Sequence, residues 1–235
     1  MKSLLITLLT PLALWSQTGE GLNIVKTNVT AYAFRNINLT YERVINQRFS
    51  LAIGYGSMLK GGIPFRDSFL DDTELSNEEV SQSHFTIEPR IYLGSGYGRG
   101  FYLAPYYRHT KVKVEEATYL VEYATESLPT RITGNASGNS GGLMVGIQWF
   151  LGASDNWALD LWIVGAHYGA GKGELRATSP RPLNPVEQQV LQDEIENLDI
   201  PFVEYTVTTD ANGANINLDG PWAGIRSGLS IGYRF

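Results

Sequence analysis

A period-two alternation of apolar and polar side chains is the feature that most constrains this chain. In residues 49–55, FSLAIGY, large apolar side chains occupy every second position and Ser, Ala and Gly lie between them. Successive side chains of a β-strand point to opposite faces, so the pattern predicts strands with one apolar face and one small or polar face. It recurs in segments of about ten residues, each followed by turn residues.

Eight such segments are predicted as strands, at about 23–34, 37–45, 49–59, 84–93, 101–110, 140–150, 157–168 and 223–235. Connections after the second, fourth and sixth segments are short, whereas the polar segments 60–83, 111–137 and 169–220 are long. This alternation and the even strand number are typical of bacterial outer-membrane proteins. The sequence therefore predicts an all-β fold, a transmembrane antiparallel up-and-down β-barrel of about eight strands with long extracellular loops. The short connection after the first strand is an exception, because it falls on the extracellular side.

The charged residues of these segments separate a membrane barrel from a soluble one. Seven lie on the small or polar faces: Lys26, Glu42, Glu88, Arg90, Arg108, Asp160 and Arg226. In the apolar interior of a soluble barrel each would cost on the order of several kcal/mol. In a polar lumen the four positive and three negative groups can pair. Since eight strands leave room only for side chains, we expect these residues to plug the lumen.

The N-terminal residues predict export. Lys2 gives a positive charge, Leu4 to Leu14 form a short apolar stretch, and Ser16 suits cleavage, so residues 1–16 are a predicted signal peptide and residues 17–235 the barrel domain. No later stretch reaches ~18 apolar residues, so no transmembrane helix is expected. The chain has no cysteine, which excludes disulfides, thiolate metal sites and a lipidated cysteine. The predicted location is the outer membrane of a gram-negative bacterium.

Large aromatic residues gather beside the predicted short turns. Phe49, Phe101, Trp149, Trp157 and Phe235 all lie on apolar faces next to a short turn or the chain end. Such a row is typical of the aromatic girdle at a membrane interface. The alternative is that these residues form the aromatic core of a β-sandwich.

The last residues, LSIGYRF (229–235), resemble the terminal strand of outer-membrane β-barrel proteins. In that class a terminal aromatic strand is the signal for the barrel assembly machinery, so the resemblance implies this role for Tyr233 and Phe235. Residues 23–56, with IEPRIYL (87–93) and FYLAPYYRH (101–109), are also similar to a family of small outer-membrane β-barrels of unknown function. This resemblance covers most strands and little of the long loops. It implies a location and a fold, and no catalytic residues.

Catalytic and metal-binding motifs are weak. His84 and Glu88 share one strand face, which a lipid-modifying enzyme could use as a rim pair, but no Ser is tied to them by spacing. The acidic stretch 67–79 lacks EF-hand spacing, and so does the segment 210–213. Residues 171–173 (GKG) are not a P-loop. No catalytic, metal or cofactor residue is predicted, and the absence of a basic stripe with aromatics argues against nucleic acid.

Local order is predicted inside the longest loop. Residues 184–199 favour a helix, with Asn184 as cap, Pro185 at the first position and Glu187 completing a capping pattern. Val186, Val190, Ile195 and Leu198 give it a partial apolar stripe, so it either packs over the barrel mouth or binds a partner. Asn212-Gly213 predicts a type I′ hairpin turn. Pro89 and Pro105 each remove a ladder donor, so a bulge or distortion is expected beside them.

Charge places the expected function on the loops. The three long segments carry a net charge of −11, whereas the chain without residues 1–16 carries −7. An acidic surface favours cationic partners or divalent metal. We therefore expect a monomeric, non-enzymatic surface protein for adhesion, ligand contact or envelope integrity, in contact with outer-membrane lipid and lipopolysaccharide. A narrow channel for small solutes and a lipid-modifying enzyme are the alternatives.

Overall fold

The computed structural model describes residues 21–64, 75–94, 96–123, 126–197 and 204–235. Within these residues the chain forms one antiparallel sheet of ten strands, a 3₁₀-helix and an α-helix. In chain order the elements are β1 (Asn23–Asn28), η1 (Thr30–Phe34), β2 (Asn36–Val44), β3 (Phe49–Gly61), β4 (Leu75–Tyr92), β5 (Gly100–Glu122), β6 (Ser127–Leu151), β7 (Trp157–Thr178), α3 (Pro185–Glu196), β8 (Glu204–Asp210), β9 (Gly213–Pro221) and β10 (Gly224–Arg234). Neither helix in these ranges is long and apolar enough to cross a membrane.

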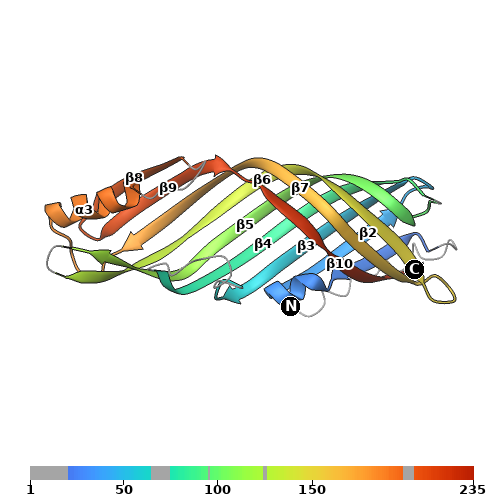
Figure 1. Ribbon diagram of the computed structural model, residues 1–235, viewed down its shortest axis with the longest axis horizontal. Coiled ribbons are helices and arrows are strands. Elements are labelled where there is room, and N and C mark those ends of the chain that lie inside the picture. The colour runs from blue at the N-terminus through green and yellow to red at the C-terminus, as the bar shows by residue number, and fades with distance from the viewer. Residues whose placement is uncertain (1–20, 65–74, 95, 124–125, 198–203) are drawn as a thin grey trace, which may run out of the picture.

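Eight strands close into a ring, because β10 pairs with β1 on one side and with β7 on the other. From β1 to β7 each strand pairs with the next in chain order. β10 covers residues 157–167 of β7, and β9 pairs with the remainder, 170–178. β8 pairs with β9 (Figure 1). The prediction of an all-β fold whose antiparallel sheet closes with eight strands is confirmed.

Most of the described residues in the expected long loops are strand, so that part of the prediction is wrong. β5 and β6 stay paired from Lys111↔Ser137 to Glu122↔Ser127, through residues expected in a loop. β7 and β9 extend the sheet beside them. Both faces of these strands carry many polar or small residues, so no apolar alternation marks them in the sequence. We call the described parts of residues 111–138 and 169–221 the extension.

An apolar core of its own holds the extension together. Leu191 and Ile195 of α3 are buried in one apolar cluster with side chains of β5, β6 and β9, among them Val121, Leu128 and Ile216. Figure 1 shows α3 beside β8 and β9, at the end of the molecule far from the C-terminus. The helix lies at the predicted place, but of its predicted stripe Val186 is exposed and residue 198 lies outside the described residues.

The cap of α3 matches its prediction. The Asn184 side chain accepts hydrogen bonds from the backbone N–H groups of Val186 (2.9 Å) and Glu187 (3.0 Å). The Glu187 carboxylate accepts one from the Asn184 N–H at 2.8 Å. This reciprocal pair satisfies amides that have no partner within the helix.

The β8–β9 hairpin is at the predicted place, but its turn type is not. Asp210 pairs with Gly213, which leaves Ala211 and Asn212 as the connecting residues. A type I′ turn needs positive φ at both connecting residues. The positive φ, 133°, is instead at Gly213, where an added Cβ would lie 2.0 Å from the Ala177 carbonyl oxygen.

The first strand ends earlier than expected, at Asn28, and η1 follows. The Asn28 side chain accepts hydrogen bonds from the Thr30 hydroxyl (2.6 Å) and the Ala31 N–H (3.0 Å). Such local bonds offer the backbone an alternative to the ladder. The helical turn ends at Arg35, whose φ is 55°.

The two strand prolines produce a gap in the ladder and no bulge. β4 and β5 keep one register from Ile87↔Tyr107 to Ile91↔Leu103, which places Pro89 directly opposite Pro105. The two missing donors therefore fall at one point of one ladder. On their other sides, Pro89 pairs with Leu51 and Pro105 with Leu143 in regular register. Of the two predicted forms, a bulge or a local distortion, the structure shows the distortion.

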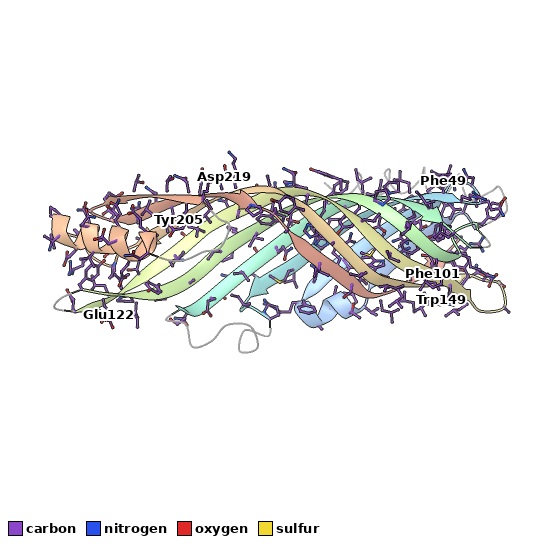
Figure 2. The ribbon with its side chains drawn as sticks, turned by 45° about the horizontal axis from the view of Figure 1, so that its top comes forward. Phe49, Phe101, Glu122, Trp149, Tyr205 and Asp219 are labelled. Carbon is purple, nitrogen blue, oxygen red and sulfur yellow. The ribbon has the colours of Figure 1, made fainter. Side chains whose placement is uncertain are left out.

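The two faces of the sheet exchange character along the strands. Around the ring, large apolar side chains are exposed on the outer face, for example Ile53, Leu143 and Trp157, while the inner face buries charged groups. In the extension, the inner face carries the apolar core and the outer face carries exposed polar groups such as Lys172 and Glu174. Figure 2 shows side chains along the whole outer surface, with Phe49, Phe101 and Trp149 at the end away from the extension.

Candidate functional site

A buried network of charged groups lies at the centre of the ring. The Lys26 ammonium donates to Glu42, Asp160 and the Gln148 side-chain oxygen, each at 2.6 Å. The Lys26, Glu42 and Asp160 side chains have no exposed surface. They come from β1, β2 and β7, so the network ties together strands that are far apart in the sequence.

Arg90 of β4 completes this network. Its guanidinium contacts Asp160 at 2.7 Å, Glu42 at 3.2 Å and Glu88 at 2.6 Å. Its guanidinium carbon lies over the Tyr102 ring, 4.4 Å from the ring centre. We call Lys26, Glu42, Glu88, Arg90 and Asp160 the charge plug. Each group of the plug is paired, so attraction between the charges compensates the desolvation penalty of burying five of them. Removal of one group would leave its partners buried without that compensation.

Two tyrosines satisfy the remaining carboxylate oxygens of the plug. The Tyr92 hydroxyl donates to Glu42 at 2.7 Å, and the Tyr102 hydroxyl donates to Asp160 at 2.8 Å. Composition alone does not single out these two residues, since the chain has 13 tyrosines. Their signal is position: both fall on the inward parity of β4 and β5, where a tyrosine needs a polar partner.

Apolar layers lie on both sides of the plug. Toward the short turns, Ile24, Val44, Phe150 and Ala158 are packed together. On the other side, Ala104, Tyr106 and Met144 pack with the two plug tyrosines. These layers and the plug are buried throughout, so side chains fill this section of the ring.

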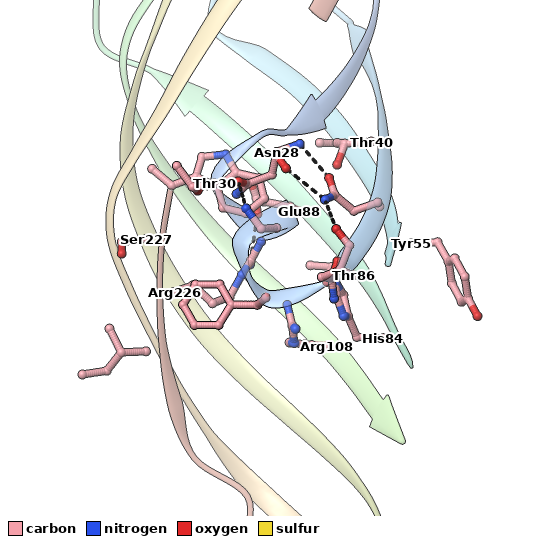
Figure 3. A pocket seen from close by; sticks show the side chains of 18 of the residues that line it. Asn28, Thr30, Thr40, Tyr55, His84, Thr86, Glu88, Arg108, Arg226 and Ser227 are labelled. Carbon is pink, nitrogen blue, oxygen red and sulfur yellow. Dashed lines mark hydrogen bonds and ion pairs between the residues drawn. The ribbon is translucent and has the colours of Figure 1, made fainter. Parts of the chain in front are cut away.

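The remaining two predicted lumen residues, Arg108 and Arg226, lie on the side of the plug that faces the extension, in a cavity of about 390 Å³ (Figure 3). Arg226 donates to Glu88 at 3.3 Å and stacks on the rings of Tyr106 (4.5 Å) and Trp162 (4.7 Å). The nearest hydrogen-bond partner of Arg108 is the Thr110 hydroxyl at 3.4 Å. We call this space the vestibule. The structure thus places six of the seven predicted lumen charges in one ion-paired network and separates Arg108 from it.

His84 and Glu88, the pair singled out in the sequence, both line the vestibule. They do not form a dyad: Glu88 accepts from Arg90 and Arg226, and the His84 Nδ1 atom is buried without a hydrogen-bond partner. The sequence did not point to η1, which also borders the vestibule through Thr30 and Phe34.

The predicted girdle residues are all on the outer face. Phe49, Phe101, Trp149, Trp157 and Phe235 are each more than a third exposed. The Tyr233 ring meets Trp157 edge to face with centres 5.8 Å apart. The terminal Phe235 exchanges two backbone hydrogen bonds with Asn23, at 3.0 and 2.8 Å, so the last residue is tied to the first strand.

Ion pairs fasten α3 to the rest of the extension. Arg181 binds Glu126 before β6 at 2.6 Å and Glu187 of α3 at 2.7 Å. Arg181 and the Asn184 N–H lower the pKa of the Glu187 carboxyl to about 2. Arg176 binds both oxygens of Asp210 and lowers the pKa of that carboxyl as well. Many acids counted in the sequence as free loop charge are therefore partnered.

The structure describes only part of the weak sequence motifs. Residues 67–74 of the acidic stretch lie outside the described residues, and Glu79 pairs with Lys60 in the wall. Residues 171–173 are strand within β7. In the described ranges no group of three or more His, Asp or Glu side chains could hold a metal ion.

No protein-family model, curated protein sequence or solved structure matches this chain. The site has three parts. They are an interior closed by paired charges, a cationic vestibule on the side that faces the extension, and an apolar outer face around the ring.

Proposed function

We propose that this protein is an integral outer-membrane β-barrel, non-enzymatic and closed to solutes, which holds the extension outside the cell for contact with a surface or ligand. The observation that carries the proposal is the inverted polarity of the ring. Large apolar side chains are exposed around it, while Lys26, Glu42 and Asp160 are wholly buried inside. Exposure of such an outer face to water is unfavourable, whereas its contact with hydrocarbon is favourable.

The height of the apolar face suits a membrane. On β6 it runs from Leu143 to Leu151, nine residues, and Asn139 follows on the same face. At ~3.3 Å per residue and a strand tilt of about 40°, nine residues span roughly 23 Å. Outer-membrane barrels carry an apolar band ≈ 25 Å tall. Beyond it, β5 and β6 continue for about a dozen residues, roughly 40 Å along each strand.

The aromatic residues and the terminal strand support an orientation. Phe49, Phe101 and Trp149 sit at the short-turn end, which is the periplasmic end in barrels of this type. The extension then projects from the cell, where its polar outer face meets water and lipopolysaccharide. Tyr233 and Phe235 close the seam with β1 and are the proposed signal for the assembly machinery. The proposal also keeps the family that the sequence resembles, the small outer-membrane barrels, and a monomeric state.

The charge plug argues against the channel alternative. A solute would have to cross a level at which Lys26, Arg90 and Gln148 are fully buried among partners. Opening that level would separate ion pairs inside a narrow ring. Purified protein in planar bilayers should therefore show no steady conductance.

Membrane integration can be tested by fractionation and gel mobility. The protein should remain in the outer-membrane fraction after carbonate washing, and its mobility should shift on heating, because a closed barrel resists detergent until boiled. Deleting Phe235 should lower the amount of assembled protein. A variant in which another signal peptide replaces residues 1–16 is the control for export. Extraction by carbonate alone would contradict membrane integration.

A further inference from the structure

The vestibule has more cationic groups than its acids can pair. Lys26 and Arg90 are bound to Glu42 and Asp160. The third acid, Glu88, is shared between Arg90 and Arg226. Among the described residues no carboxylate lies within ion-pair distance of Arg108, so this guanidinium is the surplus charge of the interior. The chain as a whole is acidic, with a formal net charge of −6, so a positive interior is a local feature.

Two polar side-chain atoms of residues that line the vestibule are buried and have no hydrogen-bond partner. The Arg226 side chain is 9% exposed, and its Nε atom has no hydrogen-bond partner. Its guanidinium is clamped between contacts to Glu88, Tyr106 and Trp162. The His84 Nδ1 atom is also buried without a partner. Buried polar groups in native proteins usually have partners, so unpartnered ones beside a cavity are free to bind a ligand there.

The shape of the vestibule gives two routes of entry. Its volume, about 390 Å³, is within the range of small-molecule sites. The pairing of β1 with β10 ends at Asn28↔Ser230, and beyond this point, toward the extension, η1 lies between β10 and β2 (Figure 3). Ile225 and Tyr55, both on the exposed apolar outer face, border the same cavity. A ligand can thus be a soluble anion entering from the mouth, or an anionic headgroup whose apolar tail stays at the outer face beside η1.

We propose that the vestibule is a binding site for a phosphate or carboxylate group, held by the guanidinium groups of Arg108 and Arg226. Arginine presents a planar fork of donors that matches the oxygens of either group. His84 adds a ring nitrogen on the same wall, since His84 and Thr86 of β4 face Thr110 and Arg108 of β5 in register. The site requires only the folded ring, so it can be tested in detergent whether or not the protein resides in an outer membrane.

The first test measures phosphate binding by titration calorimetry in a non-ionic detergent. Inorganic phosphate should bind the wild type, and Arg108→Gln should weaken Kd at least tenfold. Lys111→Gln is the matched control: it removes one positive charge from the same strand, but on the exposed outer face, and should change Kd less than twofold. Arg108→Lys keeps the charge without the fork and should give an intermediate Kd. No phosphate binding by the wild type, or equal binding by Arg108→Gln, overturns the proposal.

A fold control and a ligand comparison complete the experiment. Because Arg108 has no acidic partner, Arg108→Gln should keep the heat-dependent gel shift at or above the wild-type temperature, so weak binding cannot be attributed to unfolding. Dihexanoyl phosphatidic acid is then compared with inorganic phosphate, with dihexanoylglycerol as the control lipid that has no phosphate. Phosphatidic acid binding at least tenfold tighter than phosphate assigns the site to lipid headgroups, and equal binding assigns it to free anions. Equal binding of the two lipids overturns anion recognition.

Discussion

The ring and the extension are built on the same strands with opposite polarity. β5, β6 and β7 pass through both without a break. In the ring their inner face meets buried charges such as Asp160 and their outer face is apolar. In the extension the inner face carries Val121, Leu128 and Ala177, packed under α3, and the outer face is polar. One ladder thus serves two cores, one held by ion pairs and the other by apolar packing.

This difference teaches that the surroundings, and not the strand, decide which face must be apolar. A β-ladder satisfies its backbone in water or in lipid. Only the side chains differ according to whether water or lipid lies on each side of the sheet. The outer face of β6 changes from apolar to polar between Leu143 and Asn139. This change is therefore the feature that carries the most information about location.

The largest expected effect comes from breaking the charge plug. Asp160→Asn leaves Lys26 and Arg90 buried without their shared carboxylate, which should cost about 3–5 kcal/mol of the free energy of unfolding. The matched control is Asp155→Asn, which breaks an exposed pair with Arg99 and should cost about 1 kcal/mol or less. Denaturant unfolding in lipid vesicles measures both. Equal losses would show that the plug does not stabilise the ring.

A second variant tests whether the extension is a separate core. Leu191→Ala removes a buried side chain of α3 and should cost the extension about 2–3 kcal/mol. Hydrogen exchange should quicken in α3, β8 and β9, while the heat-dependent gel shift of the ring stays unchanged. Val186→Ala, at a site 73% exposed, should have no comparable effect. A lowered gel-shift temperature for Leu191→Ala would show that the two cores are one cooperative unit.

The helix cap should have a smaller effect in the same region. Asn184→Ala removes the acceptor for two amides of α3 and should destabilise the helix by about 1 kcal/mol. Asn184→Asp keeps an acceptor at the cap and should restore most of the protection in hydrogen exchange. If both variants exchange alike, the cap does not hold the helix on the sheet.

Acid should loosen α3 without opening the ring. The pKa of Glu187 is about 2 in the folded chain, below its ordinary value of ~4.3. A lowered pKa means that the carboxylate stabilises the fold above pH ~4.3 and that this stabilisation is lost as pH falls toward 2. Exchange of the 185–196 amides, corrected for the intrinsic pH dependence, should quicken across this window. Glu187→Gln should remove that pH dependence, and an unchanged profile would contradict the role of the Arg181 pair.

Prediction from sequence succeeded where a single rule decides the structure. Period-two alternation located the eight ring segments because the apolar and polar faces of these strands differ sharply. The cap at Asn184 and Pro185 located α3 because capping is local chemistry. The inward parity of Lys26 and Asp160 also put charges of opposite sign on one face, which the structure brings within 2.6 Å.

The missed features depend on contacts between distant residues. For the parts of β5 and β6 in the extension the sequence predicts loops, because no apolar alternation marks them. Their buried apolar residues instead contact the core under α3, which no local pattern displays. Pro89 lies opposite Pro105 only through the strand register, so the sequence could not show that one gap accommodates both. The isolation of Arg108 is likewise a matter of distance, because parity alone grouped it with the plug.

The location of the apolar face is tested most directly by site-directed spin labelling along β6. The chain has no native cysteine, so each label needs a single substitution. The outward positions to be labelled are 131, 133, 135, 137, 143, 145, 147 and 149. In reconstituted vesicles, labels at 143–149 should be relaxed by oxygen and shielded from a water-soluble nickel complex, and labels at 131–137 should show the reverse. Nickel access at all eight positions would contradict a membrane-spanning ring.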